Sequence, residues 1–183
     1  MERSFVLDTR FGPILIADEP AYRFGSTDLS ATYAEEVRLD ADNATSIHGV
    51  KAHGRWSAIF GAGGGCSTVH QHSAVEKGDR LYVAVGNRLV CLDVATGSLT
   101  WSRQVDTATC FGVHWDEPHN ALICHGEVEI SRISLDGDTI WTAAGEDIFS
   151  EDVQCLPTAI QAVDFNRSVY LFDYETGALL NRP

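Results

Sequence analysis

A 40-residue repeat is the feature that most restricts what this 183-residue chain can form. One glycine recurs at that spacing: Gly97, Gly137 and Gly177. The surrounding strings are "DVATGSLTW", "ISLDGDTIW" and "DYETGALLN". Trp101 recurs as Trp141, whereas the third copy has Asn181 at the same place. A period of this length is typical of one supersecondary unit that buries its apolar face against its neighbours, so the chain is predicted to stack similar units.

Each unit has the pattern of four short strands joined by tight turns. In the unit that spans 67–106, apolar and polar residues alternate, β-branched residues are frequent, and turn residues separate the runs. The strands expected there are 67–75, 80–85, 88–94 and 98–105. The two following units, 107–146 and 147–183, repeat the pattern. We therefore expect an all-β chain of antiparallel four-stranded sheets.

The turns of the repeat have residues suited to tight reversal. Asp93 and Asp173 precede their glycines by four positions, where a short carboxylate accepts backbone N–H groups of the turn. A second turn position is also shared by the three units: Gly86, Gly126 and Asn166. Glycine and asparagine both tolerate a positive φ, so we expect left-handed turns at these positions.

These strings resemble a known repeat. "NRLVCLDVATGSLTWS" is similar to the repeat of the pyrroloquinoline-quinone-like (PQQ-like) β-propellers, in which a strand is followed by Leu-Asp, two variable residues, Thr-Gly and a Trp four residues past the glycine. "SVYLFDYETGALL" resembles it with Asn181 in place of the tryptophan, and "RISLDGDTIWT" resembles it in part. The resemblance covers about 67–183. It implies propeller-like blades with a period of about 40 residues.

The resemblance implies little about activity. Its family includes quinoprotein dehydrogenases as well as outer-membrane assembly scaffolds. The enzymes of the family use a full ring, a metal site and a tryptophan that stacks on the cofactor. Trp101 and Trp141 occupy the structural repeat position instead. We therefore expect no cofactor, and the question of an enzyme stays open with the balance against one.

The first 66 residues do not follow the period but also have a β pattern. Runs such as "SFVLDT" and "PILIADE" are separated by turn residues. The string "HGRWSAIF" resembles the last hairpin of a unit, with Trp56 as its ring. We favour a degenerate extra blade over 1–66, with a separate β-extension as the alternative. Residues 28–39 are also compatible with a helix, although a strand is preferred.

The number of units limits the architecture. Propellers close with four to eight blades. Three clear units and one degenerate unit predict a small or incomplete β-propeller. An incomplete ring leaves strand edges exposed, and proteins normally cover or charge such edges. We therefore expect self-association through the open edges.

Charge and cysteine content exclude some classes of partner. The formal net charge is −13, from 26 acidic and 13 basic residues. Nucleic-acid binding and adsorption to anionic membranes need basic surfaces, so neither is expected. No long apolar segment marks a signal peptide or a membrane span. Five irregularly spaced cysteines favour reduced thiols and a cytoplasmic protein.

One histidine pair is a candidate metal site. His70 and His72 alternate in the expected strand 67–75, so their imidazoles would point to one face. Two imidazoles so placed can share a metal ion, with a third ligand from His48, His53 or His114. The alternative is two ordinary polar residues beside a channel or turn.

Other candidate motifs fit structural roles better. "GAGGGCS" (61–67) has the glycines of a phosphate-binding loop but lacks the Lys-Ser/Thr pair and a following helix. We therefore expect a linker there. "HWDEPHNALICH" includes several groups capable of acid–base chemistry, but Asp-Glu-Pro-His-Asn is foremost a turn sequence. No GxSxG elbow occurs, and no catalytic residue is predicted.

Two functional hypotheses remain. The first is a non-catalytic binding or scaffold module whose partner is a protein. The second is a small enzyme or metal-dependent ligand binder with a site near the channel that uses His70 and His72. The first is preferred because function has to be argued from a site, and the sequence alone defines none.

Overall fold

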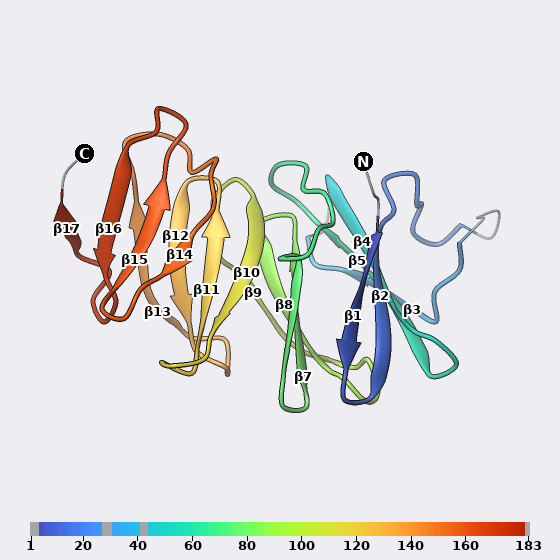
Figure 1. The fold of residues 1–183 in the computed structure, drawn as a ribbon. Coiled ribbons are helices and arrows are strands. Elements are labelled where there is room, and N and C mark those ends of the chain that lie inside the picture. The colour runs from blue at the N-terminus through green and yellow to red at the C-terminus, as the bar shows by residue number, and fades with distance from the viewer. Residues whose placement is uncertain (1–3, 27–30, 41–43, 182–183) are drawn as a thin grey trace.

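The computed structural model describes residues 4–26, 31–40 and 44–181, and every regular element among them is a β-strand. Seventeen strands form four sheets. The sheets follow one another side by side in chain order, and the first and last lie at opposite ends of the molecule (Figure 1). The expectation of an all-β chain is confirmed for these residues, and that of antiparallel four-stranded sheets is confirmed for three of the four sheets.

The first sheet has five strands in the order β1-β2-β4-β5-β3. Four of them pair antiparallel, whereas β3 pairs parallel with β5 at the edge. The preference for a strand over a helix in 28–39 agrees with β3, but its parallel pairing as a fifth strand was not predicted. The bounds are β1 Ser4–Thr9, β2 Gly12–Asp18, β3 Glu35–Arg38, β4 Ser46–Ala52 and β5 Trp56–Ala62.

The other three sheets are antiparallel meanders of four strands each, with strands in chain order. The second sheet consists of β6 Ala74–Lys77, β7 Arg80–Val85, β8 Arg88–Asp93 and β9 Leu99–Gln104. The third consists of β10 Cys110–Asp116, β11 Ala121–Gly126, β12 Glu129–Ile133 and β13 Thr139–Ala144. The fourth consists of β14 Gln154–Cys155, β15 Ala159–Val163, β16 Val169–Asp173 and β17 Leu179–Asn181.

The sheets pack face to face, so inner strands are apolar on both faces. In β7, Leu81 and Val83 join the core against the first sheet. The alternating Tyr82 and Ala84 join the core against the third sheet. All four are at most 2% exposed. Because successive side chains of a strand point to opposite faces, a continuous apolar run in β7 serves two interfaces at once.

A tryptophan stacked over a glycine joins each sheet to the next. The rings of Trp56, Trp101 and Trp141 lie over the hairpin glycines of the following sheets: Gly97, Gly137 and Gly177. A Cβ on Gly177 would lie 2.7 Å from the ring of Trp141, so only glycine admits the indole there. Each indole N–H also donates to a backbone carbonyl of that hairpin, at Val94, Leu135 and Tyr174. The prediction that Trp101 and Trp141 are structural residues of the repeat is therefore confirmed, and Trp56 has the same role.

The hairpin turns match the prediction at some positions and not at others. Asp93 accepts hydrogen bonds from the backbone of Ala95 and Thr96, as predicted. Gly86 has φ +57°, also as predicted. Gly126 lacks a positive φ, however. Glycine is nevertheless required at this position, because a Cβ there would overlap the Asp106 carboxylate.

The equivalent turn of the fourth sheet also differs from the prediction. Arg167, not Asn166, is left-handed, with φ +64°. The Asp164 carboxylate accepts the backbone N–H of Ser168 at 2.8 Å, which closes this turn one residue later than expected. The position of the left-handed residue was therefore decided by which carboxylate closes the turn.

The segment between β2 and β4 covers the outer face of the first sheet. Tyr22, Phe24 and Tyr33 pack against Ile47 and Ile59 on the face opposite the second sheet. Ile59 is fully buried as a result. The hydroxyl of Tyr33 donates to Glu19 at 2.7 Å, within the same segment. The first sheet thus has its apolar outer face covered by its own chain.

The outer face of the fourth sheet has no such cover among the described residues. Leu89, Ile130 and Val169 occupy matching positions beside the central hairpins of the second, third and fourth sheets. Leu89 and Ile130 are fully buried by the next sheet, whereas Val169 is 40% exposed. Val163 and Leu171 lie on the same face and are half-buried. The two ends of the array therefore differ.

Candidate functional site

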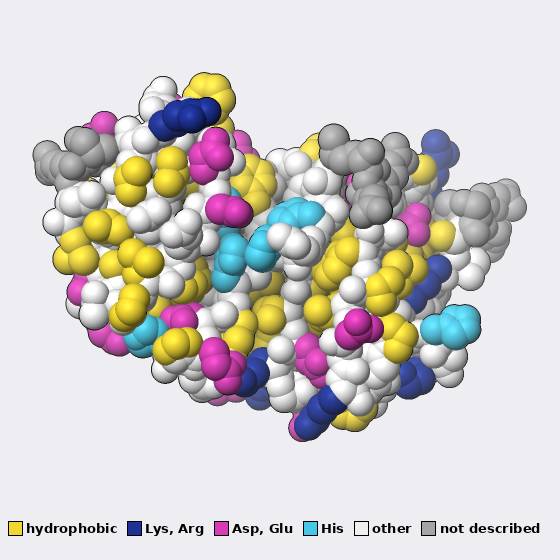
Figure 2. Space-filling view, viewed as in Figure 1, with side chains coloured by type: hydrophobic (Ala, Val, Ile, Leu, Met, Phe, Trp, Pro, Cys, Tyr) yellow, Lys and Arg dark blue, Asp and Glu magenta, His cyan; other side chains and the backbone are white. Residues whose placement is uncertain are grey.

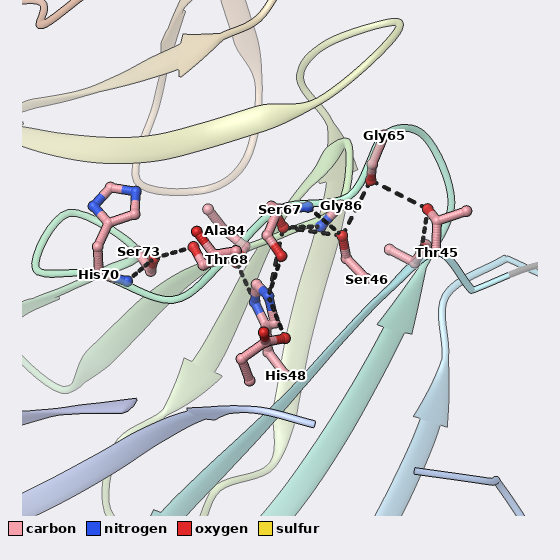
Figure 3. A network of polar contacts seen from close by, with 12 residues as sticks. Thr45, Ser46, His48, Gly65, Ser67, Thr68, His70, Ser73, Ala84 and Gly86 are labelled. Carbon is pink, nitrogen blue, oxygen red and sulfur yellow. Dashed lines mark hydrogen bonds and ion pairs between the residues drawn. The ribbon is translucent and has the colours of Figure 1, made fainter. Parts of the chain in front are cut away.

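The loop before β6 lies on the side of the array where the first strand of each sheet lies, which we call the inner side. Polar contacts fix this loop to the first two sheets (Figure 3). The backbone N–H of Ser67 donates to Ser46 Oγ at 2.8 Å. His48 Nδ1 lies 3.0 Å from the Ala84 carbonyl oxygen, so it donates to that oxygen. His48 is buried, and burial lowers its pKa. The imidazole of His48 is thus a structural link between β4 and β7.

His70 and His72 lie in a turn, not in the strand expected over 67–75. Ser73 N–H donates to the His70 carbonyl at 2.9 Å, and the strand begins only at Ala74. The His72 carbonyl accepts the N–H of Val113 in the third sheet. Because the backbone of His72 bonds to the next sheet, it is not available to extend the pairing of β6 with β7.

Both ring nitrogens of His70 already have partners. Its Nε2 lies 2.8 Å from the Phe111 carbonyl oxygen, which can only accept, so Nε2 bears the proton. Its Nδ1 accepts the backbone N–H of His72 at 3.2 Å. His70 therefore fixes the turn to the third sheet as a neutral ring.

Two further histidines complete a cluster on the inner side. The ring of His72 stacks on that of His114 in β10, with centroids 4.6 Å apart. His125 in β11 lies next, with its centroid 6.4 Å from that of His114. Histidine side chains gather near the middle of this face, with acidic side chains close by (Figure 2).

The cluster is neutral at its buried members. Burial, with the neighbouring His72 and His125 as a second cause, lowers the pKa of His114 to about 4. Burial is also the main cause that lowers the pKa of His125. Asp152 acts in the opposite direction on both rings. Since removal from water outweighs the carboxylate, His114 and His125 are uncharged near neutral pH.

Two cavities open beside the cluster and share His70 and Asp152. The larger, of about 550 Å³, lies between β1 and the loop before β6 and is lined by Ser4, Phe5, Thr68, Val69, His70, Gln71, His72 and Asp152. The second, of about 470 Å³, is lined by His70, Phe111, His125, Ser150, Glu151 and Asp152. We call the second cavity the acceptor pocket.

The metal site at His70 and His72 stays a prediction, and the geometry does not favour it. His70 would have to give up at least one of its two hydrogen bonds to bind a metal. Of the proposed third ligands, His48 bonds to Ala84, and His53 lies on the hairpin between β4 and β5 beside another cavity. Within the described ranges no group of three or more His, Cys, Asp or Glu residues is arranged to hold a metal ion.

The glycine-rich segment has a structural role, as expected. The N–H of Gly63 donates to Asp40 at 2.8 Å, and the N–H of Gly65 donates to the Ala108 carbonyl at 3.0 Å. These amides point at protein acceptors, so they are not available to a phosphate.

The other sequence candidates also have structural surroundings. The Asp-Glu-Pro-His-Asn string forms the turn between β10 and β11, as predicted. There His119 Nδ1 lies 2.6 Å from Asp116. Cys124 is buried in the core, and all five cysteines are free thiols.

Sequence reasoning did not identify the residues that give the acceptor pocket its chemistry. Glu151 and Asp152 lie in the loop before β14, about 80 residues from His70 in the chain. Phe111 is in β10 at an irregularity of the strand register. The only local signal was an acidic string, "GEDIFSED", which is equally typical of a solvated loop.

Comparisons with known proteins assign the chain to no family. No protein-family model and no curated protein matches the chain. One solved structure, BamB from Moraxella catarrhalis, is 15% identical with a TM-score of 0.49, and the match covers 60% of this chain and 35% of that one. The computationally designed Ika4 protein is 11% identical with a TM-score of 0.49, over 67% of this chain and 80% of that one.

The computationally designed Ika8 protein is 11% identical with a TM-score of 0.53, over 97% of this chain and 60% of the designed one. At this identity the likeness describes the fold alone. No helix in the described part of the chain could span a membrane.

Proposed function

We propose that the chain is a non-catalytic, protein-binding scaffold module whose four sheets are blades of an incomplete PQQ-like β-propeller. The tryptophan-over-glycine stacking at each of the three junctions between sheets supports blades of one type. In this proposal the first sheet is a degenerate blade and shares one structural domain with the other three. The net charge of −13 and the five free thiols support a cytoplasmic protein that binds proteins and not nucleic acid or membranes.

The observation that carries the proposal is the difference between the two ends of the array. Tyr22, Phe24 and Tyr33 cover the outer face of the first sheet. On the fourth sheet the corresponding face leaves Val169 40% exposed beside the half-buried Leu171. Every other interface between sheets in the array buries such positions. A protein surface is therefore needed to remove these side chains from water.

The occupant that fits this face is a second copy of the chain. Because one end of the array is covered and the other is not, each chain has a single face for association. Two copies can therefore meet fourth sheet to fourth sheet about a two-fold axis. Such a pair closes on itself and does not extend into a filament. Asn181 suits this arrangement, because its side chain bonds to the backbone of Leu171 and Val169 in its own sheet. It does not reach across as Trp141 does.

Sedimentation velocity over a concentration series tests this proposal. We expect a monomer–dimer equilibrium, and Val169→Glu is expected to raise the dimer dissociation constant at least about tenfold, because two carboxylates would be buried near the two-fold axis. Val6→Glu is the matched control, since Val6 is 57% exposed on β1 at the other end. It should leave the equilibrium unchanged.

Two results would contradict the proposal. One is a monomer at every concentration up to about 1 mM, where association would be worth no more than about 4 kcal/mol. The other is a dimer that Val6→Glu weakens as much as Val169→Glu does. Circular dichroism of both variants checks that they keep the wild-type fold.

A further inference from the structure

The acceptor pocket lies away from the face of the fourth sheet, and its chemistry stands apart from the dimer proposed above. We propose that it binds a guanidinium group, presented as an arginine side chain by a protein partner. Its lining joins two carboxylates, one unpaired imidazole nitrogen and an aromatic ring in a cavity of about 470 Å³.

The largely buried ring of His125 supplies an acceptor that is open to the pocket. His125 is 8% exposed, and its Nε2 lies 3.1 Å from the carbonyl oxygen of Phe149. A carbonyl oxygen accepts only, so the proton is on Nε2 and Nδ1 has a free lone pair. Nδ1 has no hydrogen-bond partner among the described residues, although the ring lines the pocket. This nitrogen is not sealed from solvent, so it is open to a donor that enters the pocket.

The carboxylates of Glu151 and Asp152 also lack a cationic partner. Neither takes part in a salt bridge within the described residues, and neither Lys nor Arg lines the pocket. All seven ion pairs found within the described residues engage carboxylates elsewhere on the molecule, such as Asp40, Asp136 and Asp18. The pocket therefore has an unneutralised negative charge beside an unused acceptor.

The shape of the lining favours a planar cation. The ring of Phe111 meets that of His125 edge to face, with centroids 5.5 Å apart and an interplanar angle of 78°. His70, whose nitrogens are both used, adds a second flat ring to the wall. A guanidinium has five donors in a plane and stacks on aromatic faces, whereas an ammonium is a compact point charge. A pocket that combines hydrogen-bond acceptors with aromatic rings in its wall thus suits an arginine side chain better than a lysine side chain.

Isothermal titration calorimetry of the full chain with small blocked amino acids tests the inference. N-acetyl-arginine amide should bind at least about tenfold more tightly than N-acetyl-citrulline amide, which has the same shape without the charge. N-acetyl-lysine amide (with its side-chain amine free) should bind more weakly than the arginine compound. Equal binding of arginine and citrulline compounds, or no binding of the arginine compound, overturns the proposal.

Variants locate the binding and separate the pocket from general surface charge. Asp152→Asn should weaken arginine binding about tenfold, because it removes one charge-assisted hydrogen bond. Glu35→Gln is the matched control, an exposed acid on β3 of the first sheet, and should change nothing. Phe111→Leu should reduce the preference for arginine over lysine. Equal losses from Asp152→Asn and Glu35→Gln would show non-specific attraction to an acidic protein and overturn the site.

A last comparison distinguishes the source of the guanidinium. Free L-arginine has an α-amino and an α-carboxylate group that an arginine inside a protein lacks. Blocked and free arginine should bind equally well if only the side chain enters the pocket. Binding of free L-arginine alone would overturn the assignment to a protein partner. The dimer test at Val169 is unaffected by either result, so the two proposals can fail separately.

Discussion

Replacing Trp141 with alanine is expected to lower the free energy of unfolding by about 3–5 kcal/mol. The indole is 7% exposed, lies over Gly177 and donates its N–H to the Tyr174 carbonyl at 2.8 Å. Its removal leaves a cavity between the third and fourth sheets and an unpaired backbone acceptor. Urea denaturation followed by circular dichroism measures the change. Trp141→Phe, which keeps a ring but loses the N–H donor, should cost less than half as much.

A double-mutant cycle tests whether the stacking on Gly177 is the cause. Gly177→Ala alone should destabilise the chain, because its φ is +70° and its Cβ would contact the indole. Once Trp141 is alanine, the contact no longer exists and only the backbone cost of Gly177→Ala remains. The double variant should therefore lose less stability than the sum of the two single losses. Full additivity would show that the ring and the glycine act independently.

Acidification is expected to destabilise the chain between about pH 6.5 and pH 4, before carboxylates with lowered pKa values begin to protonate. His114 has a pKa of about 4 in the folded chain, against about 6.5 when unfolded. Between these values the unfolded chain binds a proton that the folded chain does not, so protons favour unfolding. The loss from this residue amounts to about 2–3 kcal/mol. His48 and His125, whose pKa values burial also lowers, add to it in the same direction.

The measurement is the free energy of unfolding at a series of pH values. His114→Gln should flatten the profile between about pH 6.5 and pH 4, because the titrating group is gone. His53→Gln is the matched control, since His53 is exposed on the hairpin between β4 and β5, and should leave the slope unchanged. An NMR titration of the His114 ring gives its pKa directly. A slope that His114→Gln leaves unchanged would contradict the assignment.

The candidate site shows where sequence reasoning succeeded and where it failed. The metal site at His70 and His72 stays a prediction, but the strand in which the sequence placed them was wrong, because they lie in a turn. In the sequence they alternate as strand residues do, whereas in the fold the His72 carbonyl bonds to Val113 and ends the strand pairing. His125 was visible in the sequence only as part of a turn-rich string. Its place in the acceptor pocket depends on Asp152, which β12 and β13 separate from it in the chain.

The hairpins were determined by the sequence itself. The strands Arg80–Val85, Arg88–Asp93 and Leu99–Gln104 lie within the predicted ranges 80–85, 88–94 and 98–105. They do so because alternation, β-branched residues and turn residues act between neighbours a few residues apart. Only the tertiary structure decided that the segment between β2 and β4 covers the first sheet, that β3 pairs parallel, and that four histidines meet two carboxylates. These features depend on contacts between distant residues, and local patterns do not encode such contacts. The repeated glycine is an intermediate case. Its spacing is visible in the sequence, but the reason for it, the indole that packs over it from the preceding sheet, is visible only in the structure.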